Sequence, residues 1–340
     1  MARYRSSLYS IRRRRKQRRI PIILAFVVIG AVIASVYGYH PFHRSKNETA
    51  ATLTGADIIK DAADLGALVM PEIELVEYGP EAASESNAKV DELITETTVP
   101  TGAKQSRIIE ARDKLNEALT LPMNGRQRAF VKKQLSKLAD KWLFSRTVFK
   151  QDKLCGSYKV EPGDQLAAIG RRFKVPYEIL MKINNISRPE ALRAGEMIKV
   201  INGPFHATIY RSTFRMDLYL HDTFVRSFSV ALGQPGMETP TGRWVVKPNG
   251  KLISPTWPDP VTGKTYEAED PDYPLGSRWI GLEGIEGAAK GRTGFAIHGT
   301  KDAGELGTAR SRGCIRLYDE DAKLVYDLLT PGLSQVVIVE

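Results

Sequence analysis

The chain contains 340 residues, of which 42% are hydrophobic and 26% are charged, so it is long enough for two or more domains with buried cores. The formal net charge is +10, but residues 1–19 alone hold nine basic residues and no acid, which leaves +1 for the rest (10 − 9). This distribution excludes an extensive nucleic-acid-binding surface on the folded part, and a total of two cysteines excludes a disulfide framework.

Residues 20–39 carry no charged side chain, and a stretch of this length can cross a bilayer as a helix. Because the basic tail at 1–19 comes directly before it, the positive-inside rule predicts a single transmembrane anchor with a cytoplasmic N-terminus. A signal peptide cleaved after Ala34 is the alternative interpretation. Both interpretations export the remainder of the chain, so we expect its domains to lie outside the cytoplasm.

Two regions of different composition follow the anchor. Residues 40–103 are rich in Ala, Thr, Glu and Ser, and between Ser45 and Ala103 three lysines and twelve acids give a net charge of −9 (3 − 12). This composition predicts a disordered acidic linker. In residues 104–149, apolar positions with helical spacing lie on both sides of a break at Pro122–Gly125, which predicts a helical hairpin.

Residues 157–202 show a compact pattern in which two strand-like runs enclose two helical runs, in the order βααβ. The segment resembles a LysM domain in both spacing and residue type, at Tyr158, Val160, Gly163, Asp164, Leu166, Ile169, Phe173, Val175, Leu180, Asn184, Leu192, Gly195 and Ile198. The resemblance implies binding to peptidoglycan glycan strands through Gly163, Asp164 and Gln165 and through the turn before the second strand. Asp164 could also simply cap the first helix.

Residues 205–340 are rich in strand-like runs and contain one clear helix, which begins at Asp319. The pattern predicts a mostly β domain. Between residues 248 and 276 many Pro, Gly and Asp residues indicate a long irregular loop, which is typical of a lid or a binding segment. Trp257, Tyr266 and Tyr273 on this loop are candidate substrate contacts, and packing within the loop is the alternative for them.

The stretch 295–317 carries the candidate chemistry. His298 ends a short apolar run and stands sixteen positions before Cys314 (314 − 298), so an imidazole and a thiol are available for nucleophilic attack on a carbonyl. Gly313 directly before the thiol allows backbone N–H groups to converge on an oxyanion. The alternative is that both residues are structural, as most isolated cysteines and histidines are.

The residues around this pair resemble the signature of the L,D-transpeptidases of the YkuD/ErfK family, in the segments His298–Thr300, Leu306–Gly307 and Ser311–Leu317, with supporting matches at Thr239–Arg243 and Leu275–Ile280. The resemblance implies a β-sandwich fold, Cys314 as nucleophile and His298 as general base. Gly299 and Thr300 are expected to orient the imidazole, and the backbone N–H groups of Arg312, Gly313 and Cys314 are expected to donate to the oxyanion, with Ser311 beside them. Arg316, Trp279 and Tyr273 are expected to contact substrate.

Arg312 departs from the family pattern, because many members have His at this position. Its guanidinium is predicted to favour the Cys314 thiolate through its positive charge. Arg316 has an alternative role as half of a salt bridge within the fold. Cys155 has no evident function.

Together these features predict an exported, membrane-anchored peptidoglycan L,D-transpeptidase that transfers an acyl group from a tetrapeptide stem to an amine. The acceptor stays open among another stem, a lipoprotein, water and a free D-amino acid. No cofactor and no metal are expected, because the five histidines show no ligand spacing. The alternatives are a non-catalytic LysM wall anchor and a Cys-His hydrolase, although papain-like hydrolases place Cys before His.

Overall fold

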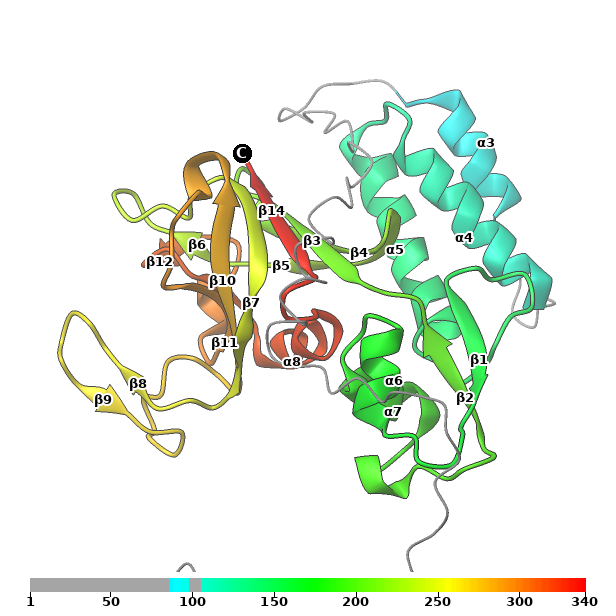
Figure 1. Cartoon of the computed structure of the whole chain (residues 1–340). Coiled ribbons are helices and arrows are strands. Elements are labelled where there is room, and N and C mark those ends of the chain that lie inside the picture. Colours follow the sequence, from blue (N-terminus) through cyan, green and yellow to red (C-terminus); the bar gives the residue numbers. More distant parts are fainter. Residues whose placement is uncertain (1–85, 98–104) are drawn as a thin grey trace, which may run out of the picture. The chain divides into compact units, whose positions relative to one another are not determined.

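The computed structural model describes residues 86–97 and 105–340, and these ranges are drawn in colour in Figure 1. The predicted basic tail at 1–19, the anchor at 20–39 and most of the linker at 40–103 lie outside them. Among the described residues, no helix is both long and apolar enough to cross a membrane.

The helical region contains a helix that the sequence did not predict, since α3 (Ala88–Glu96) falls inside the expected linker. The Asn87 side chain caps this helix by accepting from the Lys89 N–H at 2.9 Å, and Val90 and Leu93 are buried at helical spacing. The side chain of Gln127 donates to the Asn87 carbonyl at 3.0 Å. The linker prediction was therefore too long at its C-terminal end, because local capping and two buried side chains are enough to recruit this segment.

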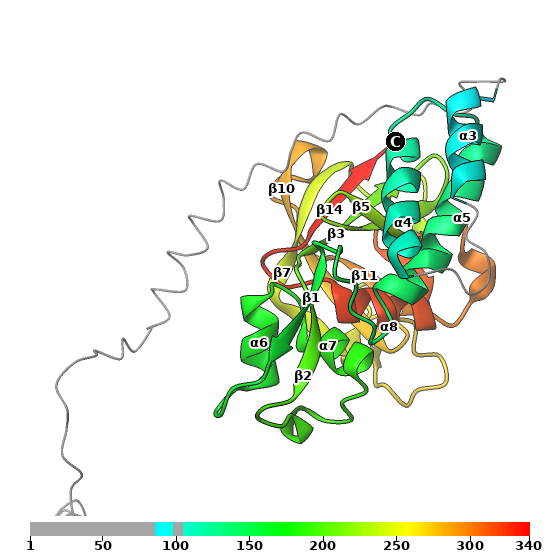
Figure 2. The same cartoon turned by 90° about the vertical axis from the view of Figure 1, so that its right-hand side faces the viewer.

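Two further helices, α4 (Gln105–Leu119) and α5 (Gly125–Trp142), form the predicted hairpin and lie beside α3 in Figures 1 and 2. A capping box starts α5, because the Asn124 side chain accepts from the Gln127 N–H while the Gln127 side chain reaches the Asn124 N–H. The buried stripe of α5 comprises Gln127, Val131, Leu135, Leu138, Ala139 and Trp142.

The βααβ order of the next region is confirmed by β1 (Cys155–Lys159), α6 (Leu166–Arg172), α7 (Tyr177–Asn184), the 3-10 helix η2 (Pro189–Ala191) and β2 (Met197–Ile201). The two strands pair antiparallel, from Cys155 opposite Ile201 to Lys159 opposite Met197. The Asn184 side chain accepts from the Lys199 N–H at 2.7 Å and donates to the Lys199 carbonyl at 2.8 Å. This double contact fixes α7 on β2.

The C-terminal domain is mostly β with one α-helix, as predicted. Its main sheet has eight strands in the order β13-β11-β10-β7-β14-β3-β4-β5. Their bounds are β3 (Phe205–Tyr210), β4 (Arg215–Leu220), β5 (Thr223–Ser229), β7 (Gly242–Ile253), β10 (Arg278–Glu286), β11 (Phe295–Thr300), β13 (Ile315–Tyr318) and β14 (Gln335–Val339). Ala231 and Arg316 exchange backbone hydrogen bonds of 3.0 and 2.9 Å, so the segment after β5 reaches back to β13. The eight strands thus form one continuous sheet whose end strands, β13 and β5, contact each other.

Short elements complete this domain: β6 (Leu232–Gly233) pairs with β12 (Ala309–Ser311), β8 (Trp257–Pro258) pairs with β9 (Thr265–Tyr266), and the 3-10 helices are η3 (Gly287–Ala289) and η4 (Ala303–Glu305). The β8–β9 hairpin extends away from the sheet in Figure 1. Helix α8 (Asp319–Leu328) packs on β10, β11 and β13 through Ala322, Val325, Tyr326 and Leu328. It therefore lies directly behind the strands that carry His298 and Cys314.

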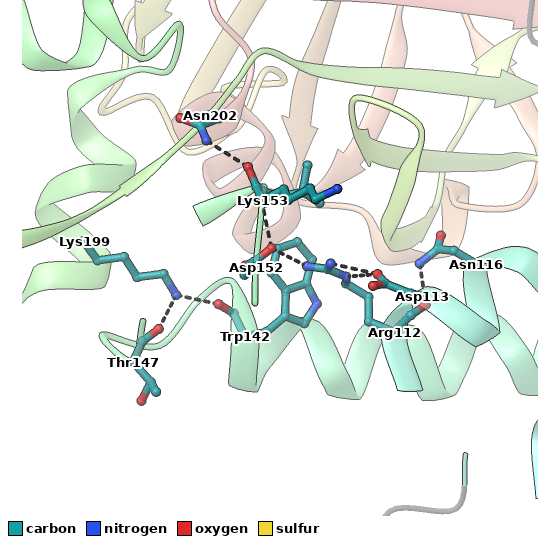
Figure 3. A network of polar contacts seen from close by, with 10 residues as sticks. Arg112, Asp113, Asn116, Trp142, Thr147, Asp152, Lys153, Lys199 and Asn202 are labelled. Carbon is teal, nitrogen blue, oxygen red and sulfur yellow. Dashed lines mark hydrogen bonds and ion pairs between the residues drawn. The ribbon is translucent and has the colours of Figure 1, made fainter. Parts of the chain in front are cut away.

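Buried ionic contacts join the helical region to the βααβ module (Figure 3). Lys199 is 2% exposed, and its ammonium donates to the backbone carbonyls of Trp142, Ser145 and Thr147 at 2.5, 2.9 and 2.8 Å. Arg112 and Asp152 form an ion pair at 2.7 Å whose side chains are 5% and 0% exposed. Because each charge has a nearby partner, these polar groups can lie inside the junction.

Candidate active site

Strand pairing brings His298 and Cys314 onto one face of the sheet. In the parallel pair of β11 and β13, Ile297 lies opposite Ile315 and His298 opposite Arg316. Cys314 immediately precedes β13, so the register sets it beside Ala296, two positions before His298 on β11. Side chains alternate along a strand, so Ala296 and His298 point to the same face. The Cys314 thiol donates to the Gly294 carbonyl at 3.9 Å, and the Ala296 N–H lies close enough to the sulfur to lower its pKa.

The His298 imidazole is buried, 3% exposed, and is held in one orientation. Its Nδ1 lies 2.7 Å from the Gly299 carbonyl oxygen, which can only accept, so Nδ1 carries the proton and Nε2 is left as the basic nitrogen. The Trp279 ring stacks on the imidazole with a centroid distance of 5.6 Å and an angle of 15°. Burial lowers the His298 pKa to about 4, against the raising effect of hydrogen bonds to the Gly299 and Leu275 backbones. The imidazole is therefore neutral at pH 7 and able to accept a proton.

The Cys314 thiol is half-buried and meets opposing influences. Burial raises its pKa, while the Ala296 N–H and the Arg316 cation lower it. The resting pair is thus a neutral thiol and a neutral imidazole. In this state proton transfer accompanies attack on the substrate, and the thiolate need not be stored beforehand.

The turn that presents Cys314 is held by two side-chain hydroxyls that form hydrogen bonds with its backbone. The Ser311 hydroxyl donates to the Cys314 carbonyl at 2.5 Å and accepts from the Gly313 N–H at 3.1 Å. The Thr239 hydroxyl donates to the Gly313 carbonyl at 2.9 Å. Gly313 has φ +106, and a Cβ there would come within 2.8 Å of the Phe295 ring, so only glycine fits.

These contacts revise the expected oxyanion donors. The Gly313 N–H is occupied by Ser311, so it is not free for a substrate oxyanion. The Arg312 and Cys314 N–H groups have no acceptor within the described part of the chain. They are accordingly the two donors that this turn can offer. Ser311 acts by shaping the turn.

The Arg312 side chain pairs with an acid and does not have the role expected for it. Its guanidinium pairs with Asp259 at 2.6 Å, and it is not among the groups that shift the Cys314 pKa. Asp259 accepts from the Val261 N–H at 2.9 Å, and this bond together with Arg312 lowers the Asp259 pKa to about 2. The hypothesis that Arg312 favours the thiolate is therefore corrected, because Arg316 is the cation that lowers the Cys314 pKa. Arg312 instead connects the β8–β9 hairpin to the turn at residues 311–314, called the nucleophile turn below.

Arg316 forms the intramolecular salt bridge that was its alternative role. Its guanidinium lies 2.6 Å from the carboxylate of Glu305, and the two side chains are 20% and 18% exposed. The Thr300 hydroxyl donates to the same carboxylate at 3.3 Å. Thr300 thus supports Glu305 and Arg316, whereas the Gly299 carbonyl orients the imidazole.

The loop between β7 and β10 is anchored at both ends. Tyr273 is 2% exposed and donates to the Pro255 carbonyl at 2.6 Å, which favours loop packing over a substrate contact for this residue. The Ser277 N–H and hydroxyl donate to Asp319 at 2.5 and 2.8 Å. Gly276 lies so close to Gly299 that a Cβ on it would be 2.7 Å from the Gly299 Cα. The loop end therefore packs against the residue that orients His298.

The sequence did not single out Asp259, Glu305, Asp319 or Ala296, although all four support the site. Three of them are acids whose partners lie elsewhere in the sequence: Asp259 pairs with Arg312, Glu305 with Arg316, and Asp319 accepts from Ser277. None of these pairs forms a recognisable sequence motif, so the sequence gives no signal for them. Ala296 acts through its backbone, which a side-chain pattern does not report. No group of three His, Cys, Asp or Glu side chains among the described residues is placed to hold a metal ion.

The predicted glycan contacts lie on an exposed surface of the βααβ module. Gly163 and Gln165 are exposed, and Asp164 accepts from the Tyr158 hydroxyl and the Glu161 N–H, both at 2.8 Å. Asp164 therefore shapes the turn after β1, whereas Gln165 occupies the cap position of α6. The Gly195 N–H donates to the Val160 carbonyl at 2.8 Å, which brings the two predicted glycan-contacting turns together.

Comparison with known proteins agrees with this division. Residues 204–338 match the family model of the L,D-transpeptidase catalytic domain, YkuD, and residues 158–200 match that of the LysM domain. A Bacillus licheniformis relative provisionally named L,D-transpeptidase YkuD is 26% identical over 182 residues, which cover 52% of this chain and 94% of the relative.

One further relative and one solved structure are similar to about half of the chain or less. A provisionally named L,D-transpeptidase ErfK/SrfK of Escherichia coli is 28% identical over 181 residues, covering 50% of this chain and 49% of the relative. The solved catalytic domain of an E. faecium L,D-transpeptidase is 19% identical with a TM-score of 0.31, covering 39% of this chain and 95% of that one. On the two family matches, this chain carries a YkuD-type L,D-transpeptidase catalytic domain and, before it, a LysM domain.

Proposed function

We propose that the protein is a membrane-anchored peptidoglycan L,D-transpeptidase that acts with Cys314 as nucleophile and His298 as general base. The observation that carries this proposal is the arrangement on β11 and β13, which sets the thiol and the imidazole on one face of the sheet. The Gly299 carbonyl fixes the tautomer in which Nε2 is the basic nitrogen. A non-catalytic wall anchor has no need of this arrangement.

The first half of the reaction forms a thioester. The Cys314 sulfur attacks the carbonyl carbon of the third residue of a tetrapeptide stem, and the thiol proton passes to Nε2 of His298. The Arg312 and Cys314 N–H groups donate to the oxyanion of the tetrahedral intermediate. When the C–N bond breaks, the imidazolium returns its proton to the departing D-alanine amine, which leaves an acyl group on Cys314 and a neutral imidazole.

The second half transfers that acyl group. An acceptor amine attacks the thioester carbon and gives a proton to His298, and the new amide forms as the Cys314 sulfur leaves and is protonated again. The low pKa of His298 suits both halves, because the base must be neutral before each attack. The Trp279 ring stacked on the imidazole restricts its rotation.

The test uses the purified full chain with muropeptides that carry tetrapeptide stems. Mass spectrometry should find released D-alanine and a cross-linked product from the wild type, and neither from Cys314→Ala. Cys155→Ala is the matched control, since it removes the other thiol. A product that is only the hydrolysed tripeptide would assign the alternative Cys-His hydrolase activity, and full activity of Cys314→Ala would refute the nucleophile.

The membrane anchor at 20–39 is a proposal from sequence, because that segment precedes the described residues. The full chain should fractionate with the cytoplasmic membrane, and an external protease should release a soluble fragment by cutting between residues 45 and 85. Recovery of a mature protein that begins at Ser35 would show instead that Ala34 is a cleavage site.

The LysM domain is proposed to hold glycan strands through the exposed turns at Gly163–Gln165 and before β2. Sedimentation with insoluble peptidoglycan tests this role. Gly163→Asp with Gln165→Ala should reduce the sedimented fraction while leaving turnover on soluble muropeptides unchanged. Unchanged sedimentation would remove these turns from the glycan contact.

A further inference from the structure

A cavity of about 560 Å³ lies between helix α5 and the strands β3 to β5. The helix and these strands are neighbours in Figure 1. It is called the α5 cavity below. One wall comes from α5 and the other from the ends and the turn of the β3–β4 hairpin and from β5. The lining residues are Gly125, Arg128, Ala129, Lys132, Lys133, Ser136, Lys137, Asp140, Tyr210, Ser212, Thr213, Arg215 and Ser227.

The wall of the α5 cavity is strongly basic. It holds five cationic side chains and a single acid, Asp140, which is already paired with Arg226. Of the cations, Lys132 is neutralised by Asp217 at 2.5 Å, and that carboxylate is fully buried. In the described part of the chain, Lys133 and Lys137 form no ion pair with an acid. Among the described residues, Lys133 and Lys137 therefore contribute positive charge to the cavity with which no acid forms an ion pair.

Arg215 contributes a second kind of unbalanced charge. Its guanidinium donates to the Ser229 hydroxyl at 2.7 Å and to the Ser227 hydroxyl at 3.0 Å, so neutral groups hold it in place. Asp321 of α8 lies within electrostatic range of Arg215 but forms no ion pair with it. A guanidinium positioned by hydroxyls keeps its charge available to a ligand.

Helix stability does not explain this pattern. Lys133 and Lys137 are four residues apart, and like charges at this spacing slightly destabilise a helix. Helix α5 also carries Arg126 and Lys141, which are exposed like Lys133 and Lys137 but do not line the cavity. Lys133 and Lys137 line it together with Ser212 and Thr213 of the β3–β4 turn.

The chemistry of the lining selects the ligand. Several convergent Lys and Arg side chains suit a phosphate group, which offers more charge and more acceptor oxygens than a single carboxylate. The Ser and Thr hydroxyls that line the other wall both donate and accept, which suits a neighbour bearing hydroxyl groups. The volume falls within the usual range of small-ligand sites, roughly 300–1,000 Å³.

We propose that the α5 cavity binds a polyol phosphate, held by Lys133, Lys137 and Arg215 at the phosphate and by the β3–β4 turn at the hydroxyls. The site is separate from the candidate active site, because none of its lining residues belongs to β11, β13 or the nucleophile turn. Two sources offer this chemistry: a soluble polyol phosphate and the headgroup of an anionic lipid.

Binding is measured by calorimetry on the full chain in neutral detergent, with glycerol 3-phosphate as the probe. Saturable binding to one site is expected. Lys133→Gln with Lys137→Gln should weaken it at least tenfold. The matched control is Arg126→Gln with Lys141→Gln, which removes the same charge from the same helix outside the cavity and should change the affinity less than twofold. Equal weakening by both double variants would overturn the site in favour of diffuse attraction.

Two further arms identify the source and the polyol part. Full chain in nanodiscs of phosphatidylcholine, with or without phosphatidylglycerol, is acetylated and the lysines are quantified by mass spectrometry. Protection of Lys133 and Lys137, but not of Lys141, by phosphatidylglycerol assigns the headgroup. Protection only by free glycerol 3-phosphate assigns the soluble source, and protection by neither overturns the proposal. Inorganic phosphate that binds as tightly as glycerol 3-phosphate would overturn the polyol part.

Discussion

The two cysteines of this chain occupy similar positions and have different chemistry. Cys155 begins β1 and Cys314 directly precedes β13, and burial raises the pKa of both thiols. Both have cations nearby, Lys199 and Arg112 around Cys155 and Arg316 near Cys314. Proximity to a positive charge therefore does not distinguish the candidate nucleophile from the inert thiol.

The difference lies in what else surrounds each thiol. The cations near both thiols are engaged, Lys199 by three carbonyls, Arg112 by Asp152 and Arg316 by Glu305 (Figure 3). At Cys155, however, the charge of Asp152 adds to burial and raises the thiol pKa to about 12. At Cys314 a backbone N–H points at the sulfur and a neutral imidazole shares its sheet face. A nucleophile requires a free base and an approach for substrate, and only the second region has both.

The largest expected effect comes from removing the two thiols one at a time. Cys314→Ala should reduce transpeptidation by roughly 10³-fold or more, because no other group in the site can form the thioester. Cys155→Ala should stay within about threefold of wild type. Turnover of muropeptides and acylation by a carbapenem, followed by mass spectrometry, measure both. Residual activity of Cys314→Ala within tenfold of wild type would erase the distinction between the cysteines.

His298 sharpens the comparison through its pH dependence. His298→Ala should lower kcat/KM by roughly 10²–10⁴-fold, the range for a lost general base. Since the His298 pKa is lowered from 6.5 to about 4 by burial, the acid limb of kcat/KM in the wild type should fall near pH 4. An acid limb near pH 6.5 would contradict the buried, neutral imidazole.

The same pKa has a consequence for stability. A histidine whose folded pKa lies below its unfolded pKa binds fewer protons when folded, so its contribution is fully present above about pH 6.5 and is lost as the pH falls toward 4. The free energy of unfolding of wild type should therefore decline across this interval more steeply than that of His298→Gln. Denaturant titrations at pH 4.5 and 7 give the unfolding free energy of both proteins. An equal decrease between pH 7 and pH 4.5 in wild type and in His298→Gln would contradict the prediction.

The region around Cys155 is expected to matter for stability and not for catalysis. Arg112→Met leaves the fully buried Asp152 carboxylate without its ion pair, which should cost about 3–5 kcal/mol of unfolding free energy. Arg146→Met is the control, because its pair with Glu196 is 56% and 31% exposed and should be worth about 0–1 kcal/mol. Equal losses in urea denaturation would show that the Arg112 pair is not buried in solution.

The sequence predicted most elements because these depend on local patterns, and the candidate pair Cys314 and His298 was proposed from a local pattern as well. Strand-like runs at Arg215–Leu220 and the helix at Asp319 coincide with β4 and α8, since alternation and capping are local properties. The pairing of Arg312 with Asp259, fifty-three residues away (312 − 259), depends on where a loop folds back. The assignment of Arg312 to the thiolate failed for that reason: adjacency in sequence is a poor guide to where a long side chain points.

The smallest expected effect separates the two arginines that flank the nucleophile. Arg316 lowers the pKa of both Cys314 and His298, whereas Arg312 is engaged by Asp259 and is 45% exposed. Arg316→Gln should therefore raise the Cys314 pKa, slow acylation at neutral pH and allow partial recovery as the pH rises. Arg312→Gln should leave the pH profile of Cys314 alkylation unchanged and alter acylation within about threefold, because the Arg312 guanidinium pairs with Asp259 and does not act on the thiol.

Two controls make this last comparison decisive. Glu305→Gln removes the partner of Arg316 and keeps its cation, so it should lower the Cys314 pKa relative to wild type or leave it unchanged, never raise it. The charge-swapped pair Arg312→Asp with Asp259→Arg should reverse any rise in KM caused by either single change. The reason is that each change acts through the ion pair between Arg312 and the β8–β9 hairpin. If Arg312→Gln moved the alkylation profile as far as Arg316→Gln did, the guanidinium of Arg312 would reach the thiol after all, and its contact with Asp259 would be secondary.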